Sequence, residues 1–225
     1  SEGVVLSYNG EIYNFKQLKN ELEILGYRFT THCDTEVLLK AWQEWGADVV
    51  HKLRGMFAFV VYDKPQDLLF VARDRLGIKP LHWAQTTKGD LLFASELKAI
   101  LVHPSIEKKL NPHAIEDFFS LGYVADPNTI FNGIFKLPPA HYALLKLSSQ
   151  KNTVEPVCYW KIENYVSNDV SSKQDISEDF ELLIEEAIKL RMVADVPLGS
   201  FLAWPVFAVV LFYVSRRCWS LFVRD

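Results

Sequence analysis

The sequence is poor in cysteine and has no surplus of positive charge, and each shortage argues against a class of protein. Its 225 residues include three cysteines, an odd number without metal-site spacing, which indicates reduced cytosolic thiols instead of a disulfide framework or a zinc module. The formal net charge of −4 at pH 7 gives no electrostatic reason to expect nucleic acid as a partner. The sequence shows no basic and apolar leader, so we expect no secretion signal.

Hydrophobic residues, by contrast, are plentiful. They make up 49% of the sequence, against 23% for charged residues, and neither internal repeats nor low-complexity tracts interrupt them. A chain of this length and composition buries a sizeable core. We therefore expect one domain of ordinary size together with part of another.

The first informative pattern lies near the start, where a β-forming run reaches Asn9-Gly10 and a helical segment follows. An apolar strand that ends at Asn-Gly presents a side-chain amide and an unhindered backbone N–H at its carboxyl end. Acyl-transfer chemistry needs two such donors to stabilise a tetrahedral oxyanion. The alternative for the dipeptide alone is an ordinary hairpin turn, which the helical character of the next segment disfavours.

The periodicity of the apolar residues predicts a mixed α/β fold with long strands buried on both faces. Asn14 and Asp34 are expected to cap the first two helices, and a later helix that opens at Asn111-Pro112 should turn Ile115, Phe118 and Phe119 toward the core. Arg73 and Asp74, which follow a strand, are expected to form a structural ion pair or to anchor a loop. The expected helices cover 15–25, 34–45, 96–102, a segment from 112 and 177–191. The expected strands cover 27–31, 56–62, 68–72, 82–84, 91–94, 130–137, 142–147 and 157–162.

Four segments together resemble the glutaminase domain of glutamine-hydrolysing asparagine synthetases, which are class II glutamine amidotransferases. They are Asn-Gly-Glu-Ile-Tyr-Asn (9–14), Asp-Thr-Glu-Val-Leu-Leu (34–39), Arg-Gly-Met-Phe-Ala-Phe (54–59) and Ala-Arg-Asp-Arg-Leu-Gly-Ile-Lys-Pro-Leu (72–81). The resemblance implies a four-layer αββα sandwich of the N-terminal-nucleophile type over 1–162. It also implies a linker at 163–176 and, at 177–202, the start of an α/β synthetase domain like those of adenine-nucleotide hydrolases.

The resemblance also assigns roles to individual residues. It implies that the Asn9 amide and the Gly10 N–H form the oxyanion hole. It further implies that Asn9, Gly10, Glu11 and Asp34 bind glutamine, with the Asp34 carboxylate paired to the α-ammonium group of the substrate. From the residue alone, Asp34 is equally well explained as a helix cap.

Two departures from the family pattern are visible. The family's cysteine nucleophile and the arginine that holds the α-carboxylate of glutamine lie upstream of the Asn-Gly motif, so we expect both outside the sequence given. Ser1 is a poor substitute, because the ends of an extended strand 1–9 lie about 25 Å apart at roughly 3.3 Å per residue. Leu202 should adjoin the family's ATP pyrophosphate loop, yet Ala-Trp-Pro follows it. For 203–225 we favour a shifted reading frame over a membrane segment, which needs about 20 apolar residues.

The resemblance thus implies a fragment of an asparagine synthase that hydrolyses glutamine and uses the ammonia, with ATP and Mg²⁺, to amidate aspartate in the cytoplasm. Glutamine and aspartate are the implied partners, a homodimer is compatible with the family, and no metal site of its own is expected. ATP and Mg²⁺ are not expected to bind this fragment well. Two alternatives stay open: a class II amidotransferase with another acceptor, and an inactive remnant that only binds a partner. The segment 194–199 favours the synthetase, because the acceptor domains of other amidotransferases are unrelated.

Overall fold

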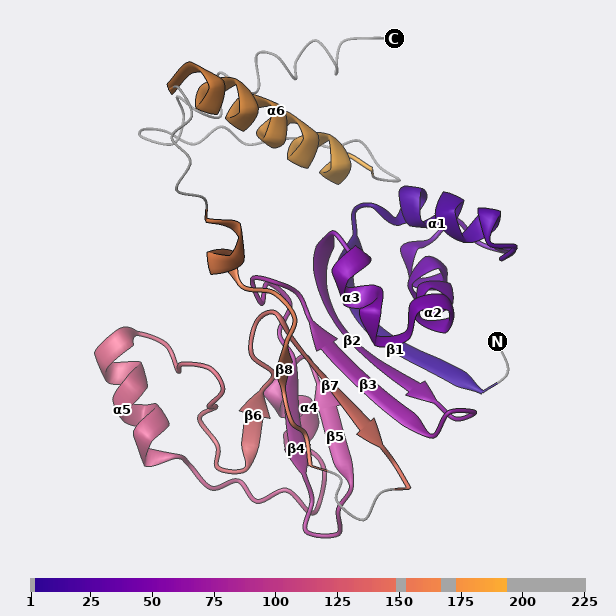
Figure 1. Ribbon diagram of the computed structural model, residues 1–225. Helices are drawn as coiled ribbons and strands as arrows, with labels where there is room; N and C mark the ends of the chain where they lie inside the picture. The colour runs from indigo at the N-terminus through magenta and orange to yellow at the C-terminus, as the bar shows by residue number, and fades with distance from the viewer. Residues whose placement is uncertain (1–2, 149–152, 167–172, 194–225) are drawn as a thin grey trace. The chain divides into compact units, whose positions relative to one another are not determined.

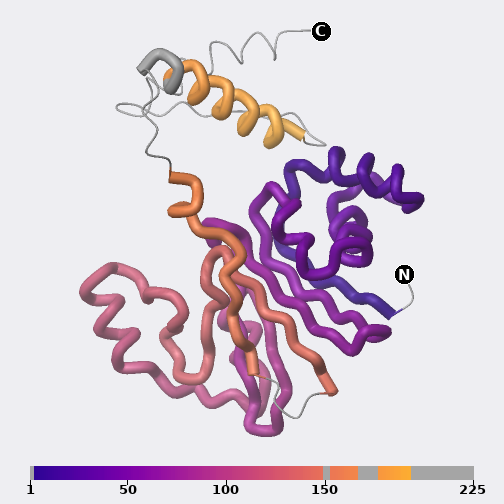
Figure 2. Tube along the Cα trace, viewed as in Figure 1, coloured from indigo at the N-terminus to yellow at the C-terminus, as the bar shows by residue number. Residues whose placement is uncertain are grey.

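The structure is a computed structural model that describes residues 3–148, 153–166 and 173–193 (Figure 2). The chain divides into two units, residues 1–165 and 166–225. The first unit contains both β-sheets (Figure 1). In the second unit, the described residues form helix α6, Lys173–Arg191, which begins four residues before the expected 177.

The larger sheet has five strands in the order β1-β2-β3-β7-β8, and all neighbours are antiparallel. Its strands are β1 (Val4–Ile12), β2 (Gly55–Asp63), β3 (Leu68–Arg73), β7 (His141–Lys146) and β8 (Val157–Cys158). In β2 and β3, the consecutive residues 57–59 and 70–72 are at most 3% exposed. Both faces of these central strands are therefore covered, as their continuous apolar runs predicted.

The smaller sheet has three strands in the order β5-β4-β6, namely β4 (His82–Gln85), β5 (Leu91–Ala94) and β6 (Ile134–Lys136). The predicted hairpin between β4 and β5 is confirmed. The two sheets pack face to face, because Val60 and Leu69 of the larger sheet share an apolar cluster with Phe93 of the smaller one. This interface forms the middle of the molecule.

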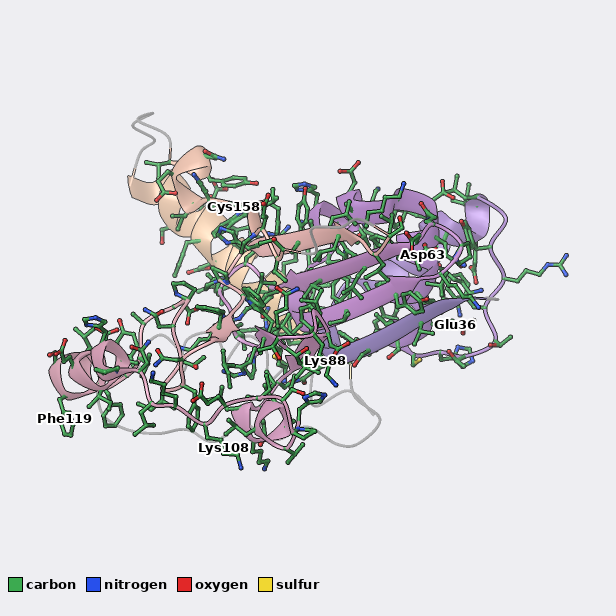
Figure 3. All side chains as sticks on the ribbon, turned by 90° about the horizontal axis from the view of Figure 1, so that it is seen from below. Glu36, Asp63, Lys88, Lys108, Phe119 and Cys158 are labelled. Atoms are coloured by element: carbon green, nitrogen blue, oxygen red, sulfur yellow. The ribbon has the colours of Figure 1, made fainter. Side chains whose placement is uncertain are left out.

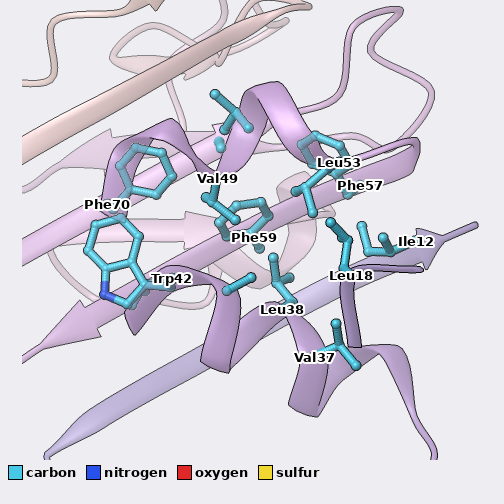
Figure 4. Packing of buried hydrophobic residues seen from close by; sticks show 14 of the residues in the cluster. Ile12, Leu18, Val37, Leu38, Trp42, Val49, Leu53, Phe57, Phe59 and Phe70 are labelled. Atoms are coloured by element: carbon cyan, nitrogen blue, oxygen red, sulfur yellow. The ribbon is translucent and has the colours of Figure 1, made fainter. Parts of the chain in front are cut away.

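Helices cover the outer face of each sheet. On the larger sheet lie α1 (Phe15–Ile24), α2 (Asp34–Trp45) and α3 (Val49–Lys52), with the 3-10 turn η1 (Gly46–Asp48) between the last two. Trp42 of α2 packs on Phe70 of β3 with ring centroids 4.8 Å apart (Figure 4). On the smaller sheet, Ile100 of α4 (Leu97–Leu101) packs against Ala84 and Ile134. The αββα order expected from the sequence is confirmed.

Several local predictions were wrong. Residues 27–31 form no strand, 130–137 contributes only β6, and 157–162 gives β8 and then the 3-10 turn η2 (Ile162–Tyr165). Asn14 precedes α1 without capping it. Its buried side chain instead donates to the carbonyl of Lys52 and accepts from the N–H of Arg54, which ties β1 to the start of β2.

The fifth helix, α5 (Pro112–Leu121), begins as predicted, and the Asn111 side chain accepts a hydrogen bond from the N–H of His113. Its aromatic residues, however, do not reach the core. Phe118 is 52% exposed and Phe119 is 83% exposed, whereas Ala114 is buried. Figure 3 shows Phe119 at the surface of α5. Apolar spacing identified one face of this helix, but spacing carries no information about what covers that face.

Arg73 and Asp74 anchor the connection that leads from β3 to β4, as predicted. The buried Asp74 carboxylate accepts backbone N–H groups of Phe57, Leu76, Ile78 and Lys79 at 2.9–3.2 Å. The Arg73 guanidinium donates to the carbonyls of residues 77, 79 and 137 and to the Asp126 carboxylate. This connection is therefore fixed by charge-assisted hydrogen bonds to its backbone.

Replacing Asp74 with asparagine tests this anchoring. The amide keeps one acceptor oxygen but turns a donor toward backbone N–H groups, and a buried donor without a partner costs about 1–3 kcal/mol. We expect Asp74→Asn to lower the free energy of unfolding by about 3 kcal/mol in urea denaturation. The matched control, Asp48→Asn at an exposed position, should change it by less than about 0.5 kcal/mol. Equal effects of the two substitutions would contradict the anchoring role.

Candidate active site

The Asn9-Gly10 pair lies inside β1 and not at its end. In the register with β2, Asn9 is opposite Ala58 and Gly10 is opposite Phe57, and pairing continues to Ile12. Both sequence interpretations, a strand terminus and a hairpin turn, were therefore wrong, because the ladder with β2 overrides the local turn propensity. A Cβ atom at Gly10 would overlap the Met56 carbonyl oxygen and come within 2.8 Å of the Phe57 Cα atom, so only glycine fits there.

The backbone N–H of Gly10 points away from β2. Phe57, its partner, bonds Asp74 with both of its polar groups, donating its N–H to Oδ2 at 3.2 Å and accepting from the Asp74 N–H at 2.8 Å. In an antiparallel ladder, Gly10 and Phe57 therefore form a non-hydrogen-bonded pair. Two residues along β1, the N–H of Ile12 also points outward and donates to the Asp34 carboxylate at 3.0 Å. The Gly10 N–H thus emerges at the edge of β1, which is an outer strand of the described sheet.

The Asn9 side chain faces the smaller sheet. Its Nδ2 donates to the Ser95 hydroxyl oxygen at 2.9 Å. Both residues line a cavity of about 160 Å³ between the sheets, with Val60, Leu81 and Phe93 as apolar walls. The second hydrogen of Nδ2 is available to a further acceptor, because an asparagine amide carries two donors.

Asp34 is the first residue of α2 and does not cap it, since the N-cap position belongs to Cys33. The expectation of a helix cap was wrong. Instead, Oδ2 of Asp34 accepts from the Tyr8 hydroxyl at 2.7 Å and from the Ile12 N–H at 3.0 Å. The carboxylate is thereby held against the same strand edge at which the Gly10 N–H emerges.

Two carboxylates, those of Glu11 and Asp34, influence Tyr8 at this edge. Burial and, next, the hydrogen bond to Asp34 raise the pKa of Tyr8 well above its usual range, and the charge of Glu11 adds to the effect. Glu11 is half-buried on β1 opposite Met56. Two carboxylates near one edge suit a cationic ligand group.

Three residues at this site received no role from the sequence. Ser95 follows β5 and bonds Asn9, His82 on β4 has its Nδ1 atom 3.1 Å from the Ser95 carbonyl oxygen, and Tyr8 holds Asp34. Ser95 and Asn9 are 86 positions apart, and only the packing of the two sheets brings them together. The sequence offered a signal for Tyr8, because this residue directly precedes the Asn9-Gly10 pair.

Other sequence expectations fall outside the described residues. Ser1, Leu202 and the segment 203–225 belong to this group. Among the described residues, no cluster of His, Cys, Asp or Glu side chains is arranged to hold a metal ion. No helix in the described part is both long and apolar enough to cross a membrane. Cys33 and Cys158 are free thiols.

Residues 1–160 match the glutamine amidotransferase domain family. The chain belongs to this family. It is 40% identical over 197 residues to asparagine synthetase [glutamine-hydrolyzing] 3 of Bacillus subtilis, covering 87% of this chain and 31% of the relative. It is 36% identical over 202 residues to a putative asparagine synthetase [glutamine-hydrolyzing] 2 of Methanocaldococcus jannaschii, covering 89% of this chain and 38% of the relative.

The chain thus spans about a third of the length of these curated relatives. Among solved structures, glutamine phosphoribosylpyrophosphate amidotransferase from B. subtilis superposes with a TM-score of 0.44 at 23% identity, covering 65% of this chain and 28% of that one.

A second acidic residue, Glu36, holds the turn that leads into Asp34. Its carboxylate accepts the N–H of Thr31 at 2.7 Å and the Thr31 hydroxyl at 2.6 Å, and it also accepts the N–H of Thr30 at 3.0 Å. Burial by itself would raise the pKa of Glu36, but these hydrogen bonds outweigh it and lower the pKa to about 2. The family's 34–39 segment therefore contains one carboxylate directed to β1 and one that fixes the preceding turn.

This depressed pKa predicts a pH-dependent stability. Because the folded-state pKa of about 2 lies below the usual 4.5, ionised Glu36 stabilises the fold fully above about pH 4.5 and progressively less as the pH falls toward 2. We expect Glu36→Gln to lower the free energy of unfolding at pH 7 and to approach the parent as the pH falls below 4.5. Urea denaturation across this range measures the difference. Glu107→Gln, at an exposed glutamate, serves as control, and a pH-independent difference for Glu36→Gln would refute the assignment.

Proposed function

We propose that this chain forms the glutaminase half of a glutamine-hydrolysing asparagine synthetase. One observation carries the proposal: the outward-facing Gly10 N–H lies on the strand edge at which Tyr8 and Ile12 hold the Asp34 carboxylate, and Asn9 is the neighbouring residue of the same strand. The α-ammonium group of a free glutamine would pair with Asp34, supported by the charge of Glu11. The side-chain carbonyl oxygen of glutamine would then lie against Asn9 and Gly10.

In this arrangement the chain stabilises the reaction without supplying its nucleophile. An N-terminal cysteine, which the family resemblance implies upstream of the sequence given, attacks the side-chain carbonyl carbon as a thiolate. The carbonyl oxygen becomes an oxyanion that accepts from the Asn9 Nδ2 and the Gly10 N–H. The tetrahedral adduct expels ammonia after protonation of its nitrogen, and water hydrolyses the remaining thioester to glutamate. Asn9 and Gly10 bind the charge that develops, whereas Asp34 binds a group that does not react.

The extent of the relatives favours the synthetase over amidotransferases with other acceptors. A match over 87% of this chain must run beyond residue 160, where the domain match ends. This supports the proposed start of a synthetase domain at 177–202, whereas the linker at 163–176 and the tail at 203–225 are proposed from the sequence alone. Aspartate, ATP and Mg²⁺ belong to that second half. Leu202, which would adjoin the nucleotide, lies outside the described residues, so residue roles are proposed for glutamine hydrolysis alone.

The proposal is tested in an extended protein, meaning this chain preceded by its own upstream coding region or, where that lacks a cysteine, by the N-terminal segment of the B. subtilis relative. Asn9→Ala deletes one oxyanion donor and should lower the kcat for glutamate release by about 10²–10³-fold. Asp34→Asn removes the charge that would pair with the ammonium group, which does not react, so it should raise KM for glutamine more than it lowers kcat. Steady-state glutamate release measures both constants.

Asp48→Asn is the matched control for Asp34→Asn, because it removes an exposed carboxylate outside the site. Thermal melts of each variant show whether the protein is folded. An extended protein that is folded but releases no glutamate would support the alternative of an inactive remnant. Wild-type kinetics in both folded variants would mean that glutamine binds elsewhere.

A further inference from the structure

The Asn9 amide is held from the opposite sheet. Ser95 directly follows β5, and its hydroxyl oxygen accepts the hydrogen bond from Asn9 Nδ2 at 2.9 Å. Asn9 itself belongs to β1 at the edge of the larger sheet. The contact therefore crosses the interface between the two sheets, inside the cavity that both residues line.

The orientation of this amide decides whether it stabilises or repels an oxyanion. An asparagine side chain has two orientations of nearly the same shape, related by a half-turn about χ2, and this torsion is only weakly restricted by itself. One orientation offers N–H to a developing negative charge, and the other offers a carbonyl oxygen. A serine hydroxyl can accept from Nδ2 or donate to Oδ1, so the contact with Ser95 fixes the position of the amide group; in the observed orientation Nδ2 bonds Ser95 and its second hydrogen remains for the substrate oxygen.

Ser95 is itself fixed by the smaller sheet. Its carbonyl oxygen lies 3.1 Å from Nδ1 of His82, on the neighbouring strand β4. A carbonyl oxygen can only accept, so Nδ1 must carry the hydrogen in this contact. His82 also pairs with Ala94, the residue before Ser95, in the β4–β5 ladder. The position of Ser95 is thus set by backbone pairing and by a side-chain hydrogen bond.

We propose that Ser95 is a positioning residue that holds the Asn9 amide with its N–H directed at the reacting carbonyl oxygen of glutamine. This role rests on the proposed glutaminase function. Ser95 would not touch the substrate and would act only through Asn9. Loss of its hydroxyl should therefore weaken the transition state while leaving the Asp34 contact with the glutamine ammonium group in place.

The experiment is a double-mutant cycle in the extended protein. We expect Ser95→Ala to lower kcat on the order of tenfold, less than deletion of the donor itself, with KM for glutamine nearly unchanged. In the Asn9→Ala background, Ser95→Ala should have no further effect, because the group that it orients is gone. Ser95→Thr keeps a hydroxyl and should restore most of kcat. Ser120→Ala, the same change at an exposed residue of α5, is the control.

A second readout does not depend on turnover. In ¹⁵N-labelled protein, the Asn9 side-chain amide protons should shift and exchange faster with water in Ser95→Ala, and Ser95→Thr should keep the parent signals. If thermal melts show that Ser95→Ala is unfolded, Ser95→Cys, which offers a weaker acceptor of similar shape, replaces it in both measurements.

The outcomes separate the two claims. An unsubstituted extended protein that releases no glutamate refutes the proposed function. With an active protein, three results would each overturn the role of Ser95. They are an unchanged kcat in folded Ser95→Ala, an equal loss of kcat with and without Asn9, and a rise in KM as large as the fall in kcat.

Discussion

Nine consecutive residues of β1 pair with β2, and this ladder places Tyr8, Asn9 and Gly10 of the candidate site. The pairing is close at Gly10, where no Cβ atom fits against the backbone of β2. Asp74 bonds the backbone N–H and carbonyl of Phe57 on the side of β2 that faces away from β1. The N–H of Gly10 therefore points to the outer edge of β1. Without this register, the N–H groups of Gly10 and Ile12 would not face the strand edge at which Asp34 is held.

The two faces of β1 contact different layers of the sandwich. Tyr8 faces the helix layer and holds the Asp34 carboxylate, while Asn9 faces the smaller sheet and is held by Ser95. This follows from the alternation of side chains along a strand. The edge of β1 thus has a carboxylate held on one face and an amide held on the other.

The sequence predicted the architecture well where continuous apolar runs or turn residues marked the elements. The runs 56–62 and 68–72 gave the central strands, the break between 84 and 91 gave a hairpin, and Asn111-Pro112 gave the start of α5. Predictions failed where a polar side chain had a choice of partners. Asn14 and Asp34 were both expected to cap helices, but each bonds a backbone far along the chain instead. The spacing of residues along the sequence does not show whether such a side chain bonds a nearby backbone group or a distant one.

By itself, the sequence determined the mixed α/β composition, the family resemblance and the presence of the Asn9-Gly10 pair and Asp34, to which the proposal assigns glutamine binding. Those features are local, since they depend on burial patterns and on short motifs. The tertiary structure alone decided that Asn9-Gly10 continues a strand, that the Gly10 N–H faces outward and that Ser95 meets Asn9 across the sheet interface. These depend on strand register and sheet packing, which join residues as many as 86 positions apart. The tertiary structure also decided that Phe118 and Phe119 of α5 stay exposed, because burial depends on what packs against a helix face and not on the spacing of its apolar residues.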